Sequence, residues 1–411
     1  MAIPVPPKYV REFEKLGFGM FVHFGLYSQM KAGEWVKHIS GIPKEEYEKL
    51  FDTFTAEDFD AKVLVRTAKE AGAKYIVLTT RHHEGFSLFD ASGVSEFDAP
   101  HSPAGRDLIR EYVDACNEEG IVPFFYHTTL DWHMDSFNDA FTSYLEYLRK
   151  SVEILCTRYG KIGGLWFDGN WWRPHDDWHE DELYATIRKY QPEAIIVNNT
   201  GIGARGKLGH PEIDSVTFEN GRAQPMDREG APRYVAAEMC QTINDHWACA
   251  EADFHSKSTG DLIETLCACR KVGANYLLNI GPTEQGGIDP LQRELLRVVG
   301  RWLGIFGEAI YETVPCGVEG EYKNFGLKNE KGEYFLFVHD LARIGNVNVT
   351  VPGGGNGPKT FTGVPAGVKS INWIDNGESL SFKEEDGKLT VNCTGYPYGR
   401  SYVVRVAKVT F

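Results

Sequence analysis

The feature that most restricts the fold of this chain is an alternation of buried strands and amphipathic helices between residues 17 and 306. The strand-like runs are short and almost continuously apolar, which is typical of parallel strands that helices cover on the outside. The helix-like segments carry an apolar stripe at a spacing of three or four residues. The number of repeats favours a sheet closed into a (β/α)8 barrel of the TIM type over an open sheet.

Individual elements can be placed on this pattern. The expected strands are residues 17–25, 75–80, 121–126, 162–167, 193–199, 215–219 and 275–280. The expected helices are residues 55–72, 108–119, 137–159, 180–190, 258–272 and 290–306. Apart from its one short strand, the stretch 200–236 is rich in glycine, proline and charge, and long irregular loops inside a compact domain are often functional.

The C-terminal part of the chain has a different pattern. Short alternating runs at residues 334–338, 346–351, 368–373 and 402–406 are separated by Gly, Asn and Asp, as in an antiparallel β-sandwich. A chain of 411 residues has room for a barrel of about 250 to 300 residues and an appended domain. We therefore expect a barrel domain at residues 1–312 and a β-sandwich domain at residues 313–411.

Composition narrows the class of partner and the compartment. The net charge of −15 disfavours a general binder of nucleic-acid phosphates or anionic membranes. An aromatic content of 13% with nine Trp suits stacking on sugars or other rings, and it also suits a large core. The eight Cys show neither a disulfide framework nor a paired CxxC zinc pattern, so we interpret them as reduced thiols. Without a signal-peptide h-region or an apolar run near 18 residues, we expect a soluble cytoplasmic protein.

Candidate chemistry gathers where the expected strands end. Asp168 directly follows the run 162–167, and active sites of parallel α/β barrels lie at that end of the strands. Taken alone, Asp168 and Gly169 are better explained as a turn, and the neighbouring aromatic residues as core. Similar polar endings on other strands favour a site instead, among them Glu219 after the strand 215–219.

Histidines are part of this set. His23 lies near the end of the first strand, where a lone histidine is more often a core residue, and His82 and His83 follow the second strand. Neighbouring strand residues face opposite sides, so His82 and His83 would share a metal only if the backbone turned there. Hydrogen bonding to ligand hydroxyls is the favoured role. Two carboxylates from different strand ends, surrounded by His and Trp, are the equipment of glycoside hydrolysis.

Five ordered motifs resemble those of the α-L-fucosidases of glycoside hydrolase family 29. They are FGMFVHFGLYS with GEW, YIVLTTRHHEGFSLF, LWFDG, the EMC segment with Trp247, and GANYLLNIGPTEQGGI. The resemblance covers nearly the whole chain and implies a (β/α) barrel followed by a β-sandwich. It also implies a retaining exo-glycosidase that removes terminal α-L-fucosyl residues from fucosylated oligosaccharides or fucosides, with no cofactor and no metal, and it leaves the oligomeric state open.

The resemblance also implies roles for single residues. Asp168 corresponds to the nucleophile and Glu219 to the acid/base, with Glu238 and Glu34 as the alternatives for the second role. The positions that match contacts to the fucose hydroxyls, ring and methyl face are His23, Glu34, Trp35, His82, His83, Tyr126, Trp166 and Trp247.

One segment departs from the family pattern. Family members commonly carry Asn-Asp-Arg-Trp after the fifth strand, whereas this chain has Asn-Asn-Thr-Gly at 198–201, so the usual sugar-contacting arginine is missing. Arg205 and Arg222 are candidates to replace it. Two alternative functions are a catalytically silent fucose-binding protein and, less favoured, a metal-dependent barrel hydrolase that uses His23, His82 and His83.

Overall fold

The computed structural model describes residues 2–343 and 355–411. They form two compact units, one of residues up to 257 with 275–297, the other of 258–274 with 298–411. The domain boundary that we expect between residues 312 and 313 divides the chain into two continuous segments, and it stays a prediction. The expected strand at 346–351 lies outside the described residues. Within the described part of the chain, no helix combines the length and the apolar character that a membrane span requires.

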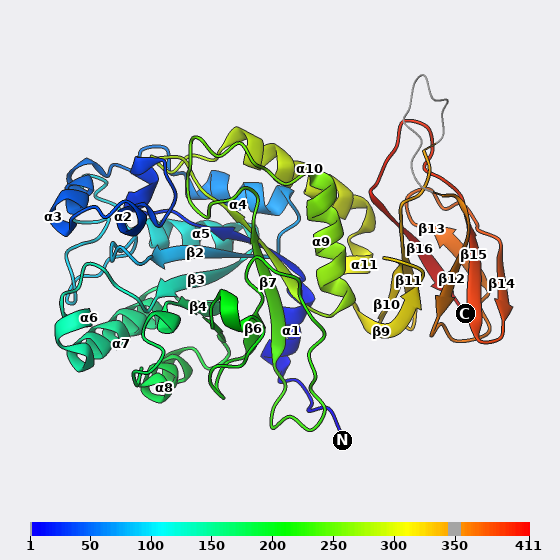
Figure 1. The fold of residues 1–411 in the computed structure, drawn as a ribbon, viewed down its shortest axis with the longest axis horizontal. Coiled ribbons are helices and arrows are strands. Elements are labelled where there is room, and N and C mark those ends of the chain that lie inside the picture. Colours follow the sequence, from blue (N-terminus) through cyan, green and yellow to red (C-terminus); the bar gives the residue numbers. More distant parts are fainter. Residues whose placement is uncertain (1, 344–354) are drawn as a thin grey trace. The chain divides into compact units, whose positions relative to one another are not determined.

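The first unit contains a closed barrel of eight parallel strands in chain order, which confirms the expected barrel (Figure 1). Strand β8 pairs with β1 and closes the ring. The strands are β1 (Phe18–Val22), β2 (Tyr75–Arg81), β3 (Val122–Thr128), β4 (Gly164–Asp168), β5 (Ile195–Asn199), β6 (Ser215–Thr217), β7 (Ala236–Thr242) and β8 (Asn275–Ile280).

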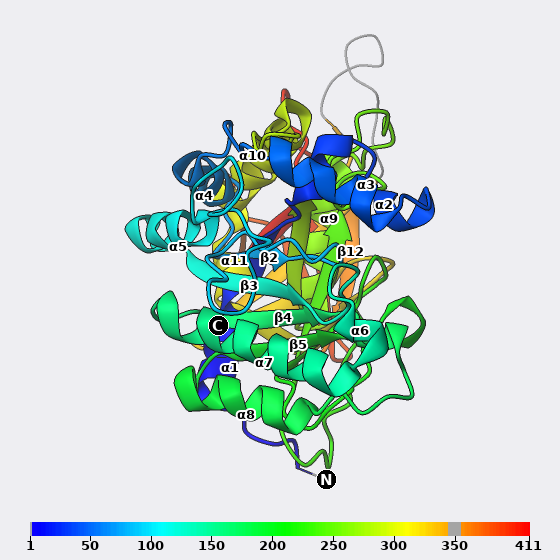
Figure 2. The ribbon, with the colours of Figure 1, turned by 90° about the vertical axis from the view of Figure 1, so that its left-hand side faces the viewer.

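Helices cover the outside of this barrel, and Figure 2 shows α4, α5, α7 and α8 outside strands β2 to β5. The α-helices of the unit are α1 (Lys8–Leu16), α2 (Val36–Ile39), α3 (Lys44–Tyr47), α4 (Ala61–Glu70), α5 (Leu108–Glu119), α6 (Ser136–Asp139), α7 (Phe141–Arg158) and α8 (Glu180–Tyr190). Its 3-10 helices are η1 (Leu26–Met30), η2 (Glu48–Thr53), η3 (Asn170–Trp172) and η4 (Ile202–Ala204).

Local chemistry explains where these helices begin and end. The Asp60 side chain accepts the N–H groups of Lys62 and Val63, so α4 begins after Asp60 rather than at the expected residue 55. The helix expected at 137–159 is divided into α6 and α7, because Ala140 has an extended φ of −149° that no helix continues through.

The barrel interior is filled by apolar and aromatic side chains from all sides of the ring. Phe13 of α1 packs against Tyr75 and Phe124, near the first residues of β2 and β3, with ring centroids 5.8 Å away in both cases. Helix α1 therefore fills the N-terminal end of the barrel, opposite the ends where the candidate site residues lie. Packing of this kind makes the barrel a solid scaffold rather than a pore.

The second unit holds an eight-stranded antiparallel sheet in the order β13-β16-β11-β10-β9-β12-β15-β14. Its elements are α9 (Thr259–Lys271), α11 (Glu308–Tyr311), β9 (Thr313–Gly320), β10 (Phe325–Asn329), β11 (Tyr334–His339), β12 (Gly357–Thr362), β13 (Ser370–Trp373), β14 (Phe382–Glu385), β15 (Lys388–Cys393) and β16 (Val404–Thr410). Trp373 of β13 and Val391 of β15 share one core although their strands stand far apart in the sheet. The sheet thus folds over itself, which confirms the expected β-sandwich.

The division between the units falls inside α10 (Pro290–Phe306).

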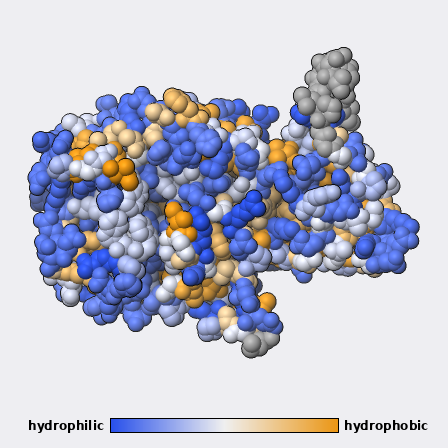
Figure 3. Space-filling view, viewed as in Figure 1, coloured by the Kyte–Doolittle hydropathy of each residue, from blue (hydrophilic) through white to orange (hydrophobic). Residues whose placement is uncertain are grey.

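The molecular face drawn in Figure 3 is mostly hydrophilic, and its apolar areas are small and scattered. This fits the acidic composition of the chain.

Candidate active site

A cavity of about 630 Å³ opens at the C-terminal ends of the barrel strands. All predicted site residues except His83 line it, and His83 lies directly behind Asp168. The lining residues that had been predicted are His23, Glu34, Trp35, His82, Tyr126, Trp166, Asp168, Glu219 and Trp247. Trp171 and Asn199, which were not among the predicted site residues, also line the cavity.

Asp168 is the last residue of β4, and neutral donors surround its carboxylate. Trp171 Nε1 donates to Oδ1 at 2.8 Å, and the Tyr126 hydroxyl donates to Oδ2 at 3.0 Å. Asn199 Nδ2 donates to Oδ1 at 3.1 Å. Burial raises the pKa of Asp168, while these hydrogen bonds act in the opposite direction. The hydrogen bonds therefore fix the orientation of the carboxylate. They also offset part of the free-energy cost of burying its negative charge.

Glu219 follows β6, which ends two residues earlier than the sequence pattern indicated. Its Oε2 accepts a 2.8 Å hydrogen bond from Asn199 Nδ2, the same nitrogen that donates to Asp168. Burial and then the negative charge of Asp168 raise the pKa of Glu219 to about 7. At neutral pH a substantial fraction of Glu219 therefore carries a proton beside an ionisable partner.

Glu238, the first alternative for the acid/base role, lies inside the barrel on β7. Tyr75 donates to its Oε2 at 2.5 Å and Trp166 Nε1 donates to its Oε1 at 3.0 Å. Burial raises its pKa to about 7 as well. Both oxygens are occupied, and Glu238 is not among the described residues that line the cavity.

Glu34, the second alternative, lines the cavity from the loop after β1. Its Oε2 accepts the backbone N–H groups of Trp247 at 3.1 Å and Ala248 at 3.0 Å. These bonds fix the loop that carries the Trp247 indole. The arrangement gives Glu34 a role in shaping the wall of the cavity.

The tautomer of His23 follows from its partner. Asn279 Nδ2 donates to the Trp247 carbonyl at 2.6 Å, so its Oδ1 is the acceptor that faces His23 Nδ1 at 2.7 Å. His23 therefore carries its proton on Nδ1. Because burial lowers its pKa to about 3, His23 is neutral and its Nε2 is an unprotonated acceptor.

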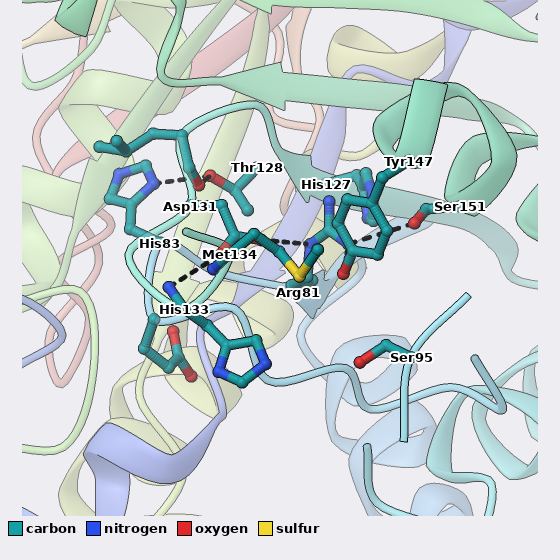
Figure 4. A network of polar contacts seen from close by, with 12 residues as sticks. Arg81, His83, Ser95, His127, Thr128, Asp131, His133, Met134, Tyr147 and Ser151 are labelled. Carbon is teal, nitrogen blue, oxygen red and sulfur yellow. Dashed lines mark hydrogen bonds and ion pairs between the residues drawn. The ribbon is translucent and has the colours of Figure 1, made fainter. Parts of the chain in front are cut away.

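His83 has the same tautomer by the same reasoning. The Thr128 hydroxyl donates to the Leu130 carbonyl at 2.5 Å and therefore accepts from His83 Nδ1 at 2.7 Å. His83 Nε2 then stands 3.5 Å from Asp168 Oδ2 (Figure 4 draws the His83 to Thr128 contact). Burial lowers the pKa of His83 to about 3, so the ring is neutral and its unprotonated Nε2 faces Asp168.

Arg81, the last residue of β2, supports the two histidines that follow it. Its Nη1 donates to the Tyr147 hydroxyl at 2.6 Å and to Ser151 at 3.2 Å, and its Nε lies 3.8 Å from Asp131 Oδ2 (Figure 4). Arg81 and Asp131 are both about 1% exposed. A buried charge pair of this kind fixes the loops that begin at the ends of β2 and β3.

Aromatic rings form much of the remaining wall. Tyr126 stacks on Trp166 at 5.6 Å and on His82 at 5.4 Å between ring centroids. Trp35 stacks on Trp171 at 6.0 Å. Such rings match the apolar faces of a pyranose, while the neutral histidines match its hydroxyls.

Two further predictions concern a metal site formed by histidines and an arginine in the cavity. In the described part of the chain, no three His, Cys, Asp or Glu side chains are arranged to hold a metal ion. Neither Arg205 nor Arg222 is among the described residues of the cavity lining. Arg205 donates through Nε to the backbone carbonyl of Glu219 rather than to its carboxylate.

A parallel barrel with two partly buried carboxylates at its strand ends, in a cavity lined by His and Trp, has the arrangement of a glycoside hydrolase. Residues 7–308 match the family model described as Alpha-L-fucosidase, and the chain belongs to this family. Membership favours a glycoside hydrolase over a silent binding protein and over a metal-dependent hydrolase.

Relatives and solved structures agree with this assignment. The chain is 31% identical to tissue alpha-L-fucosidase of Bos taurus over 80% of this chain and 74% of the relative. It is 28% identical to the Homo sapiens tissue enzyme over 80% and 75%. It is similar to Alpha-L-fucosidase isoenzyme 1 from Paenibacillus thiaminolyticus, with a TM-score of 0.83, 30% identity and 98% of both chains covered. An alpha-L-fucosidase of Bacteroides thetaiotaomicron, 23% identical, shares the fold with a TM-score of 0.82 over 99% of this chain and 96% of that one.

Proposed function

We propose that this protein is a retaining exo-α-L-fucosidase that releases terminal α-L-fucosyl residues from fucosylated glycans or fucosides by double displacement. One observation supports this most directly: a single Asn199 nitrogen hydrogen-bonds both Asp168 and Glu219. At 3.1 Å and 2.8 Å from that nitrogen, the two accepting oxygens lie within about 6 Å of each other. Retaining glycosidases have carboxyl separations of roughly 5 to 5.5 Å, and inverting ones roughly 6.5 to 9.5 Å.

In the first step, the Asp168 carboxylate attacks the anomeric carbon while Glu219 gives its proton to the leaving oxygen. The bond from this carbon to the aglycone breaks, and a β-fucosyl ester forms on Asp168. A pKa of about 7 keeps Glu219 available as an acid at neutral pH. The Trp171, Tyr126 and Asn199 donors stabilise Asp168 in its ionised form.

In the second step, Glu219 is a carboxylate and takes a proton from the attacking water. Water adds to the anomeric carbon, the ester bond to Asp168 breaks, and α-L-fucose leaves with its configuration retained. Once Asp168 is esterified, its negative charge no longer raises the pKa of Glu219, which therefore becomes easier to ionise when a base is needed.

The residues around the pair bind the sugar in this proposal. His23 offers a neutral Nε2 acceptor, and His82 is likewise kept neutral because burial holds its pKa well below the usual range. His83 lies behind Asp168 rather than in the cavity wall. Trp247, whose ring lies 5.1 Å from that of His23, packs on the methyl face of the fucose. Glu34 and Trp35 complete the wall, with Tyr126 and Trp166 beneath the ring.

The test of this proposal uses an aryl α-L-fucoside and a slow, fluorinated fucoside. Nuclear magnetic resonance of the first product should show α-L-fucose before mutarotation, and peptide mass spectrometry should find a fucosyl adduct on Asp168. A matched Asp168→Asn sample should carry no adduct. Release of β-L-fucose first, or an adduct on another carboxylate, would contradict the mechanism. A panel of α1,2-, α1,3-, α1,4- and α1,6-fucosylated oligosaccharides then gives the linkage preference.

Chelators should leave the activity unchanged, because both steps need only carboxylates and hydrogen-bond partners. Hydrolysis of an aryl fucoside is measured before and after extended dialysis against EDTA. Loss of activity that zinc or manganese restores would assign His23, His82 and His83 to a metal site instead.

We also propose the cytoplasm as the location. The eight cysteines have neither the density nor the spacing of a disulfide framework, as is usual for proteins of a reducing compartment. The acidic surface charge fits a neutral glycan partner and no nucleic acid.

A further inference from the structure

Asn199, the last residue of β5, connects the two carboxylates physically. It is the register partner of Asp168 at the end of the neighbouring strand β4, and its side chain is 4% exposed. One hydrogen of its amide points to Asp168 Oδ1 at 3.1 Å, and the other points to Glu219 Oε2 at 2.8 Å. Both amide hydrogens are therefore used on the two carboxylates.

The orientation of this amide is fixed by a third contact. Asn199 Oδ1 accepts the backbone N–H of Gly201 at 3.0 Å. If the amide were reversed, its oxygen would face two carboxylate oxygens and its NH₂ group would face another N–H donor. The turn at 199–201 thus locks the two amide hydrogens towards Asp168 and Glu219.

We propose that Asn199 is the positioning residue of the catalytic pair: its amide sets the spacing of Asp168 and Glu219 and makes Glu219 Oε1 the oxygen that transfers the proton. The proposal rests on the proposed roles of the two carboxylates. In this proposal Asn199 acts through the two carboxylates, and no covalent bond to Asn199 forms or breaks.

The assignment of Oε1 follows from hydrogen-bond chemistry. A carboxyl group that is both protonated and an acceptor accepts best through its carbonyl oxygen, and Oε2 accepts from Asn199. The proton of Glu219 then sits on Oε1. After Glu219 gives up this proton, Oε2 still accepts from Asn199, so the contact is kept in both steps and the site needs no reorganisation.

An uncharged bridge is also what this pair requires. A cation at the same place would hold Glu219 ionised and remove the acid, whereas a carboxylate would repel both partners. The other titratable groups that face the pair are Tyr126 and His83 beside Asp168, with Arg205, Glu34 and Cys240 around Glu219. Among the residues that the structure describes, Asn199 is the one whose side chain hydrogen-bonds both Asp168 and Glu219.

Asn199→Asp tests the proposal. The variant keeps the size of the side chain and the acceptor for the Gly201 N–H, but it replaces both donors with a negatively charged oxygen. We expect kcat/KM for an aryl α-L-fucoside to fall about 100-fold, since two hydrogen bonds to charged groups are lost. The added negative charge disfavours ionisation of Asp168 and Glu219, so both limbs of the pH profile should move to higher pH.

Two further variants make the result decisive. Asn199→Ala removes the donors without adding charge, so it should move both limbs of the pH profile to higher pH by a smaller amount. If the Asn199→Asp variant does not fold, this variant tests the positioning role. Asn198→Asp is the matched control, because the Asn198 side chain hydrogen-bonds Tyr184 and Glu180 rather than Asp168 or Glu219. It should keep the limbs of the parent enzyme, and thermal unfolding shows which variants are folded.

The outcomes separate this inference from the proposed function. A folded Asn199→Asp variant with the parent pH limbs and kcat/KM would reduce Asn199 to a support of the turn and overturn the inference. A parent protein without fucosidase activity, or full activity in Asp168→Gly, would overturn the proposed function instead. The oxygen assignment is read from a substrate complex of Asp168→Asn, in which the leaving oxygen should contact Glu219 Oε1; contact with Oε2 would contradict it.

Discussion

Asp168→Gly should lower the turnover of an aryl α-L-fucoside by about 10⁴- to 10⁶-fold, because no covalent intermediate can form without the nucleophile. Steady-state kinetics measure the loss, and circular dichroism melting shows that the barrel is intact. Azide should restore part of the activity by occupying the space of the lost carboxylate. It attacks the α-fucoside directly, so a single inversion should give β-fucosyl azide.

A nearby carboxylate provides the control for this variant. Asp177 is 84% exposed, and Asp177→Asn should have the turnover of the parent. If folded Asp168→Gly retains near-parent turnover, the nucleophile lies elsewhere. Removal of the Asp168 charge should also lower the pKa of Glu219, because that charge is, after burial, the next largest cause that raises it.

Glu219→Ala should lower hydrolysis of fucosylated oligosaccharides by about 10²- to 10⁴-fold, because their leaving groups need protonation. Activated aryl fucosides need little protonation, so their first step should be nearly normal and the fucosyl-enzyme should accumulate as a burst. Azide should then restore turnover by attacking this ester. Two successive inversions should give α-fucosyl azide, the opposite anomer to that from the Asp168 variant.

The matched comparison is Glu238→Ala, which removes the other barrel carboxylate with a pKa of about 7. Glu238 holds Tyr75 and Trp166 inside the barrel, so its loss should reduce stability without producing azide rescue. Azide rescue in Glu238→Ala and its absence in Glu219→Ala would transfer the acid/base role to Glu238.

Most of the barrel could be predicted because a strand buried on both faces is a continuous apolar run. Every residue of β2 and of β8 is buried, and both strands were placed from this pattern. Strand β7 was not, because Glu238 and Gln241 interrupt its run. Glu238 is tolerated there through partners 163 and 72 residues away, which no local pattern reveals.

The candidate site likewise contains residues that a local pattern can place and residues whose role depends on contacts between strands. Single residues such as His23 and Asp168 could be placed at strand ends from the sequence, since each belongs to one strand. Asn199 was passed over as part of a segment that lacks an arginine, although it stood at a strand end. Its contacts depend on β4 and β6 lying on either side of β5, and this neighbourhood exists only once the barrel has formed.

The hydrogen bond between His23 and Asn279 joins the first barrel strand to the last. Until β8 is in place, His23 has no partner to fix its tautomer, and the Trp247 loop lacks its contact with Asn279. On the ribosome, the sugar pocket therefore cannot assemble from the N-terminal part of the chain as it emerges. We therefore expect the pocket to be completed only after residue 279 has left the exit tunnel.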